Sequence, residues 1–105
     1  MLTFNDYQTS ALATAIYPEK HTIVYPALGL VDEAGEAVGK VKKWLRGDKE
    51  LDRSELAKEI GDVLWYAAAL SRDIGYTLEE CAQMNINKLL DRQDRGVLKG
   101  DGDNR

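Results

Sequence analysis

The chain has 105 residues, with 14 basic and 18 acidic side chains and a formal net charge of −4. This length suits one domain with a modest core, and the acidic balance argues against non-specific binding to nucleic-acid polymers. The single cysteine, Cys81, excludes an internal disulfide and a thiolate metal site, and no apolar run approaches the ~18 residues of a membrane span. The N-terminus lacks a signal-peptide pattern, so we expect a cytoplasmic protein without membrane contact.

The first helix is predicted over residues 3–17, where apolar side chains recur at helical spacing. Asn5 and Gln8 resemble a capping box at its start. The following segment, residues 19–25, lies between two prolines and predicts a loop or a short extended stretch.

A second helix is predicted over residues 26–46. Its apolar side chains alternate steps of three and four, which is typical of a stripe that faces a core or a partner helix: Val31, Ala34, Val38, Val41 and Leu45. The end of this helix is basic: Lys40, Lys42, Lys43 and Arg46. The helix dipole accounts for most of this run. One or two of these lysines are also candidates for a phosphate contact, but their spacing does not show which.

Two carboxylates, Glu33 and Glu36, lie off that apolar stripe, three residues apart and on one face of the helix. An isolated pair of this kind would simply face solvent. Nearby, Gly29, Gly35 and Gly39 each cost the helix roughly 1 kcal/mol relative to alanine. Such a cost is usually offset by the close approach of a neighbour or a ligand, so we interpret this face as functional.

A third helix is predicted over residues 52–73, where Asp52 and Glu55 resemble a capping box. Residues 63–70 are apolar almost all round, so we expect this helix to be central and contacted on several sides. Trp65 points away from the main apolar stripe. It packs either against the first helix or against a second copy of the chain, and the sequence leaves both open.

The third helix carries a second pair of carboxylates, Glu59 and Asp62, again three residues apart, and Tyr66 follows on their face. If the two acidic faces meet, four carboxylates share one space. Their repulsion and desolvation would raise their pKa values unless cations were bound. Hard divalent ions take oxygen ligands, so the quartet predicts a site for Mg²⁺, with Mn²⁺ as the alternative.

A fourth helix opens with the capping box of Thr77 and Glu80. Three polar side chains line one flank of it: Asn85, Lys88 and Arg92. They form either a polar rim or a set of donors for anionic oxygens. Residues 96–105 contain three glycines and alternating charge, which predicts a flexible tail after a single all-α domain over residues 1–95.

The carboxylate spacing resembles that of the MazG-like nucleoside triphosphate pyrophosphohydrolases. In that family E-x-x-E is followed, after a short helical connection, by E-x-x-D; here Glu33-x-x-Glu36 and Glu59-x-x-Asp62 are separated by 22 residues. Three further segments resemble the family: residues 28–30 before the first pair, residues 42–43 after it, and residues 85–92. The tail is similar to that of small single-domain phage or bacterial members.

The resemblance implies a four-helix all-α fold completed by dimerisation, as a homodimer or a homotetramer (dimer of dimers), with the active site near the subunit interface. It also implies Mg²⁺- or Mn²⁺-dependent cleavage of a nucleoside triphosphate between the α and β phosphates, in house-cleaning of the nucleotide pool. The implied metal ligands and catalytic residues are Glu33, Glu36, Glu59 and Asp62. The implied nucleotide contacts are Tyr66, Asn85, Lys88 and Arg92. Asp32 departs from the family, where many members have a small residue or a second glutamate.

Two other functions stay open. A related all-α enzyme could use the same quartet on another pyrophosphate ester, of the phosphoribosyl-ATP type. A non-enzymatic helical interaction module would carry the acids as surface charge, which the nearby glycines and the apolar run after Asp62 disfavour. No serine–histidine or cysteine–histidine arrangement and no P-loop occurs, which favours metal-dependent hydrolysis by water. Candidates for shaping a base pocket are Tyr17, Tyr25, Trp44 and Trp65.

Overall fold

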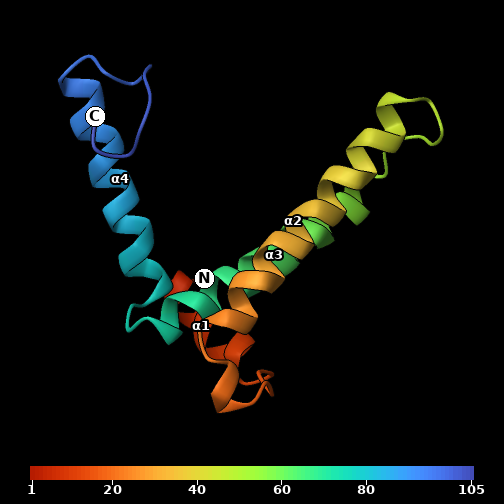
Figure 1. The fold of residues 1–105 in the computed structure, drawn as a ribbon, viewed down its shortest axis with the longest axis horizontal. Helices are drawn as coiled ribbons and strands as arrows, with labels where there is room; N and C mark the ends of the chain where they lie inside the picture. Colours follow the sequence, from red (N-terminus) through yellow and green to blue (C-terminus); the bar gives the residue numbers. More distant parts are fainter.

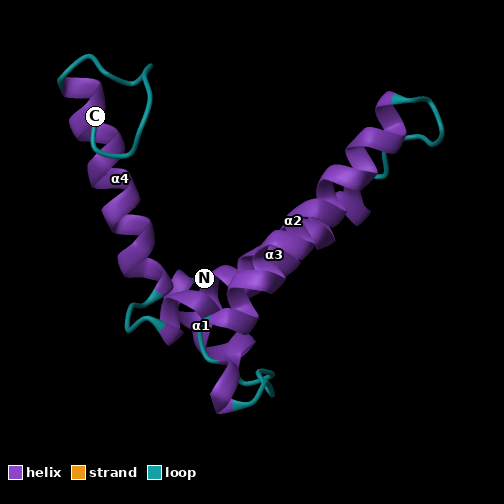
Figure 2. Ribbon diagram, in the orientation of Figure 1, coloured by secondary structure: helices purple, strands orange, loops and turns teal.

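The computed structural model describes all 105 residues and contains helices and loops but no strand (Figure 2). The elements in chain order are α1 (Phe4–Leu12), the 3₁₀ turn η1 (Glu19–His21), α2 (Val24–Leu45), α3 (Arg53–Asp73) and α4 (Leu78–Asp94). The predicted all-α fold class with four α-helices is confirmed. None of these helices combines the length with the low polarity that crossing a bilayer requires.

The chain has the outline of a V (Figure 1). One arm is a long hairpin in which α2 and α3 run side by side, and the other arm is α4 alone, with α1 at the base. α3 contacts α1, α2 and α4, which confirms the central position predicted from its apolar segment. The Cα radius of gyration is 16.4 Å, against ~13 Å for a compact domain of this length. A closed four-helix bundle therefore does not form within one chain.

Much apolar surface stays exposed in the single chain. The accessible surface is 7857 Å², whereas a folded monomer of this mass exposes ~5,900 Å². The predicted apolar stripe of α2 does not face a core in the single chain, since Val31, Val38 and Leu45 are exposed. On α4, Ile86, Leu89 and Leu90 are exposed in the same way. The fully buried side chains cluster instead where α1, α2, α3 and α4 converge, at Pro26, Ala68 and Ala69.

The N-terminal cap of α1 differs from the predicted one. Thr3 Oγ1 accepts a hydrogen bond from the Asp6 backbone N–H (3.0 Å), and the Asp6 carboxylate accepts one from the Thr3 N–H (3.2 Å). The predicted capping residues bind other helices. Asn5 donates to the Glu79 carboxylate on α4 (2.9 Å), and Gln8 donates to a backbone carbonyl of α3 and accepts from a backbone N–H of α4.

The end of α1 is also earlier than predicted: the helix stops at Leu12 rather than at residue 17. The reason is competition for the Ala11 carbonyl, which accepts from Thr14 Oγ1 (2.6 Å) and from Trp65 Nε1 (3.1 Å). Trp65 therefore packs against the first helix, which settles the two alternatives for that side chain in favour of the intramolecular one.

α2 begins at Val24, slightly before its predicted start, and Pro26 lies in its first turn, where its missing N–H costs nothing. The residue before the helix, Ile23, has φ 71°, a conformation that a β-branched residue rarely adopts. Asp73 at the end of α3 holds it there, since its carboxylate accepts from the Ile23 N–H (2.9 Å) and from the Tyr17 hydroxyl (2.8 Å). This carboxylate fixes the connection between η1 and α2 onto α3.

The predicted starts of the last two helices are confirmed. Asp52 accepts from the Glu55 backbone N–H (3.1 Å) at the start of α3. Thr77 and Glu80 form the reciprocal capping box at the start of α4. Gly75, with φ 90°, supplies the left-handed turn between these helices.

Candidate functional site

Three of the four predicted carboxylates meet on the α2–α3 hairpin. Glu33 comes from α2, and Glu59 and Asp62 come from α3; each offers an oxygen, and these oxygens all lie within 4.8 Å of one another. The fourth, Glu36, lies on the neighbouring turn of α2 and is exposed outside this group. We call Glu33, Glu59 and Asp62 the acidic cluster.

The crowding of negative charge acts most strongly on Glu33. Desolvation makes the largest contribution to raising the pKa of Glu33, and the negative charges of Glu36, Asp62 and Glu59 raise it further. The other three carboxylates of the predicted quartet, including Glu36 outside the cluster, therefore all act on Glu33. A raised pKa means that the ionised form of Glu33 is disfavoured until a positive charge arrives.

Glu59 has an unsatisfied oxygen. Its Oε2 is buried and has no hydrogen-bond partner, while its Oε1 lies 3.8 Å from Lys40 Nζ. A buried carboxylate oxygen without a partner is costly, and a cation among the three acids would satisfy it. The donors are carboxylate oxygens only, which suits Mg²⁺ or Mn²⁺ rather than a softer metal. The residues present therefore fit the predicted metal.

Tyr66 lies directly over Gly29 beside the acidic cluster. A Cβ added at Gly29 would come within 2.1 Å of Tyr66 Cε1, so only glycine fits under this ring. The other two glycines of the predicted functional face differ, because a Cβ at Gly35 or Gly39 would meet nothing within 4 Å. The expected close approach exists at Gly29 and does not exist at the other two positions within one chain.

Aromatic rings continue from Tyr66 into a hollow of about 490 Å³. The Tyr66 ring lies 5.0 Å from Trp65 and 6.1 Å from Tyr25, and Tyr25 stacks on Tyr17 at 5.1 Å. Three of the four aromatic candidates thus gather here, whereas Trp44 lies near the far end of α2. Hydrogen bonding with Tyr25, desolvation and the nearby Glu33 carboxylate raise the pKa of Tyr66 to about 12.

The predicted donors on α4 lie apart from the acidic cluster in a single chain, because α4 diverges from the hairpin (Figure 1). Lys88 Nζ donates to Asp103 Oδ1 of the tail (2.8 Å), and Arg92 lies 3.3 Å from the same oxygen. Arg92 is only 6 % exposed, and its Nε has no partner. Asn85 is exposed. Lys88 and Arg92 therefore hold the tail here rather than facing the acids.

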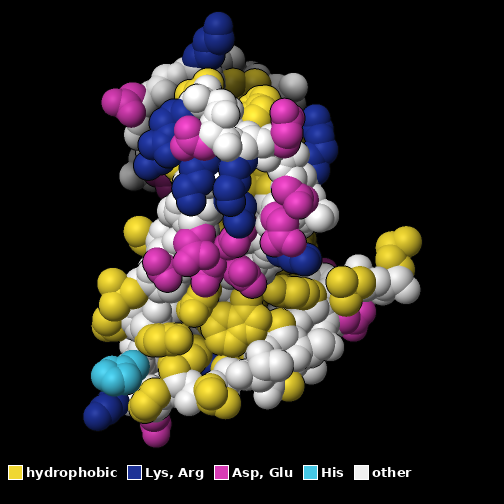
Figure 3. Space-filling view, turned by 90° about the vertical axis from the view of Figure 1, so that its right-hand side faces the viewer, with side chains coloured by type: hydrophobic (Ala, Val, Ile, Leu, Met, Phe, Trp, Pro, Cys, Tyr) yellow, Lys and Arg dark blue, Asp and Glu magenta, His cyan; other side chains and the backbone are white.

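Three lysines lie around one hollow at the tip of the hairpin, and one of them, Lys49, was not singled out from the sequence. Lys40 and Lys43 from α2 and Lys49 from the connecting loop line one hollow of about 720 Å³, whereas Lys42 does not line it. Lys49 went unnoticed because no spacing rule relates a loop residue to a helix face. Seen from the hairpin side, basic, acidic and apolar side chains follow one another as three bands (Figure 3).

Comparison with known proteins agrees with this arrangement. The sequence profile of the MazG nucleotide pyrophosphohydrolase domain matches residues 23–97. The chain belongs to the MazG nucleotide pyrophosphohydrolase family. The match begins just before α2 and ends just after α4, so it includes the hairpin with its acidic cluster and leaves out α1.

This MazG domain is also similar to a protein named Gene 37 protein from Mycobacterium phage L5. The two are 46% identical over 110 residues, which cover 94% of this chain and 96% of that protein. No solved structure matches significantly. The resemblance inferred from the carboxylate spacing is thereby confirmed at the level of the family.

Proposed function

We propose that this MazG domain is a Mg²⁺-dependent nucleoside triphosphate pyrophosphohydrolase, with Mn²⁺ as a possible substitute. It would cleave the bond between the α and β phosphates, so that water and the triphosphate give the monophosphate and pyrophosphate, in house-cleaning of the nucleotide pool. The observation that supports this most strongly is the acidic cluster, in which one oxygen of Glu59 is buried without a partner.

The acids of the hairpin divide the work of hydrolysis. Glu33, Glu59 and Asp62 would hold the metal, with Glu36 on the next turn as the fourth candidate. Bound divalent ions would offset the charge of the triphosphate and lower the pKa of the attacking water. The candidate to accept the proton of that water is one of the first-pair glutamates, Glu33 or Glu36, through a carboxylate oxygen that is not used in coordination.

The aromatic hollow is the proposed place for the nucleoside. Tyr17, Tyr25 and Trp65 offer ring faces there, and base stacking on such faces contributes ~1–3 kcal/mol per base. Tyr66 lies between this hollow and the acidic cluster. Its phenol is protonated at neutral pH and can donate to a sugar or phosphate oxygen.

We also propose that the active form is a homodimer or a dimer of dimers. The chain exposes ~2,000 Å² more than a compact monomer of its mass, and a stable interface covers ~800 Å² or more of each partner. Asn85, Lys88 and Arg92 would then reach substrate on a second copy. Sedimentation equilibrium should show twice the chain mass or a higher multiple, and a monomer at micromolar concentration would contradict this proposal.

The reaction is tested by incubating the purified protein with Mg²⁺ and each common NTP and dNTP, and a phosphoribosyl-ATP sample, and by resolving the products on an ion-exchange column. We expect a monophosphate and pyrophosphate in equal amounts from at least one nucleotide. Diphosphate and orthophosphate would contradict the cleavage position. Turnover of phosphoribosyl-ATP alone would assign the site to the other pyrophosphate ester, and no turnover of any substrate would contradict the enzyme proposal.

A further inference from the structure

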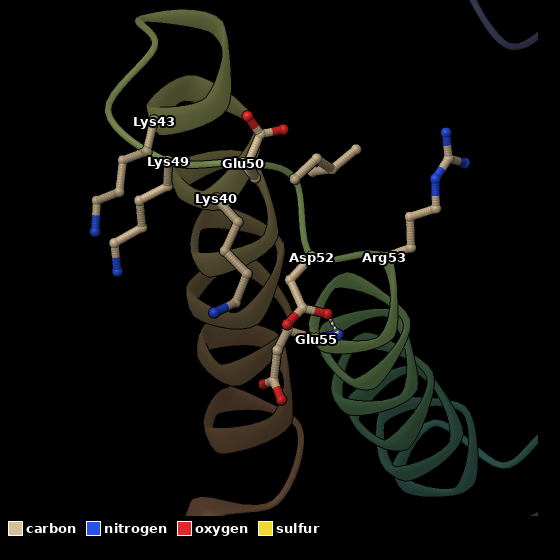
Figure 4. A pocket seen from close by; sticks show the side chains of 8 residues that line it. Lys40, Lys43, Lys49, Glu50, Asp52, Arg53 and Glu55 are labelled. Carbon is tan, nitrogen blue, oxygen red and sulfur yellow. Dashed lines mark hydrogen bonds between the residues drawn. The ribbon is translucent and has the colours of Figure 1, made fainter.

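The tip of the α2–α3 hairpin carries a hollow that the proposed reaction does not yet use. It has a volume of about 720 Å³ and lies between the end of α2, the loop after it and the start of α3. Figure 4 shows the side chains of Lys40, Lys43 and Lys49 extending to one side of it, while Arg53 points away from them. We call Lys40, Lys43 and Lys49 the lysine group.

The charges of the lysine group are poorly compensated. Lys43 and Lys49 form no ion pair, and Lys40 reaches only Glu59, at 3.8 Å. Ammonium groups gathered in this way repel one another, and an anion between them relieves the repulsion.

Three acids line the same hollow: Glu50 forms no ion pair, and Asp52 and Glu55 are engaged by other groups. Asp52 Oδ1 accepts from the Glu55 N–H (3.1 Å) and from Ser54 Oγ (3.0 Å), and these bonds hold the pKa of Asp52 below its usual range. Glu55 Oε1 pairs with Lys58 Nζ at 3.0 Å. None of these three acids pairs with the lysine group, whose ammonium groups extend together to one side of the hollow (Figure 4).

The lysine group is continuous with the acidic cluster. Lys40 Nζ contacts Glu59, and Lys40 and Lys43 follow Glu36 on α2 by four and seven residues, or ~6 and ~10 Å along the helix axis. This spacing is comparable to the length of a diphosphate group. In Figure 3 the acidic band lies between the basic band and the apolar band.

We propose that Lys40, Lys43 and Lys49 form the subsite for the β and γ phosphates, and thus for the departing pyrophosphate; this rests on the proposed pyrophosphohydrolase function. The order of the three bands then matches the order of a nucleoside triphosphate, with the nucleoside at the aromatic hollow and the α phosphate at the acidic cluster. Cations aimed at the leaving group stabilise the charge that develops on it as the α–β bond breaks. A nucleoside diphosphate would leave Lys43 and Lys49 without an anion, so the subsite also selects triphosphates.

The test compares Lys43→Ala and Lys49→Ala with Lys42→Ala. Lys42→Ala is the matched control: it removes the same charge from the same end of α2, and Lys42 lies outside the hollow. The probe is inorganic triphosphate with Mg²⁺, titrated calorimetrically. We expect each of the first two variants to weaken binding by about tenfold or more, since each removes a charge-assisted contact. Lys42→Ala should change it less than about twofold, and Lys43→Arg should retain binding.

The same variants are then assayed with the best nucleoside triphosphate. Lys43→Ala and Lys49→Ala should lower kcat/KM by about tenfold and leave monophosphate binding unchanged. Unfolding temperatures that equal that of the wild type would show that folding is intact. Equal triphosphate binding in all three alanine variants would overturn the subsite even if the wild type is active. Selective loss of triphosphate binding without any pyrophosphate release by the wild type would keep the anion site and remove the proposed reaction.

Discussion

The two arms of the V differ in how many of the predicted site residues a single chain brings together. In the α2–α3 arm, carboxylates that lie 26 and 29 residues apart in the sequence meet within 4.8 Å. In the α4 arm, contacts with other helices lie near its beginning, where Gln8 and Asn5 bind Leu78 and Glu79. The rest of α4 binds only its own tail. The acidic cluster is thus a property of one chain, whereas α4 brings no side chain to it within that chain.

The largest expected effect comes from substitutions in the acidic cluster of the hairpin arm. Glu59→Gln and Asp62→Asn keep side-chain volume but remove the charge that would hold the metal. We expect pyrophosphate release to fall ~100-fold or more, because even changes to groups that only orient metal ligands cost roughly 10–100-fold. Asp94→Asn, at the end of α4, is the matched control and should retain activity. Normal turnover in both cluster variants would contradict the account.

The packing of the hairpin arm is tested at two glycines of the same helix. Gly29→Ala places a Cβ within 2.1 Å of the Tyr66 ring, and such overpacking costs ~1–3 kcal/mol. Gly35→Ala has open space around it and should stabilise α2 by up to ~1 kcal/mol. Urea unfolding measures both changes in the free energy of unfolding. The same sign for the two substitutions would show that Tyr66 does not lie over Gly29.

The α4 arm is tested through its cap. Thr77→Ala removes the hydroxyl that accepts from the Glu80 N–H (3.0 Å), a change that costs ~1 kcal/mol at a helix N-terminus. Because α4 has few contacts beyond its first turns, we expect faster amide hydrogen exchange in α4 and little change in α2 and α3. Thr9→Ala, an exposed substitution within α1, is the control. Equal acceleration in all helices would mean that the two arms unfold as one unit.

The smallest effect concerns the tail. Lys88 and Arg92 hold the pKa of Asp103 below its usual value of 3.8. A carboxylate with a lowered pKa in the folded state stabilises docking above pH 3.8, and this stabilisation is lost as the pH falls through the lowered pKa. The NMR signals of the tail and of α4 beside Lys88 should shift together on acidification, with the buried, non-titrating Ala68 and Ala69 of α3 as the internal reference. Tail signals that do not change would contradict this docking.

Local signals predicted the elements that local chemistry determines. The caps at Asp52 and Thr77 and the helix periodicity were sufficient for α3 and α4, and the i, i+3 spacing placed each acid pair on one face. The end of α1 was predicted wrongly, because Trp65, which takes the Ala11 carbonyl, lies on another helix. The contact with Trp65 depends on tertiary structure and leaves no trace in the local pattern, whereas the other competitor, Thr14, lies in the segment itself.

The candidate site also contains some features that local spacing predicted and others that depend on the tertiary structure. Glu33, Glu59 and Asp62 were predicted correctly to come together, since two helix faces need only a short connection to meet. The separation of Asn85, Lys88 and Arg92 from the cluster depends on the direction in which α4 leaves Gly75, which no spacing specifies. Lys49 joins the lysine group through the fold of a loop.

Metal binding by the hairpin alone is tested most directly by titrating the protein with Mn²⁺ and following the free ion by electron paramagnetic resonance. We expect binding by the wild type and by Lys88→Ala, and loss of that binding in Glu59→Gln and Asp62→Asn. Wild-type affinity in both cluster variants, or loss of binding in Lys88→Ala alone, would contradict this expectation.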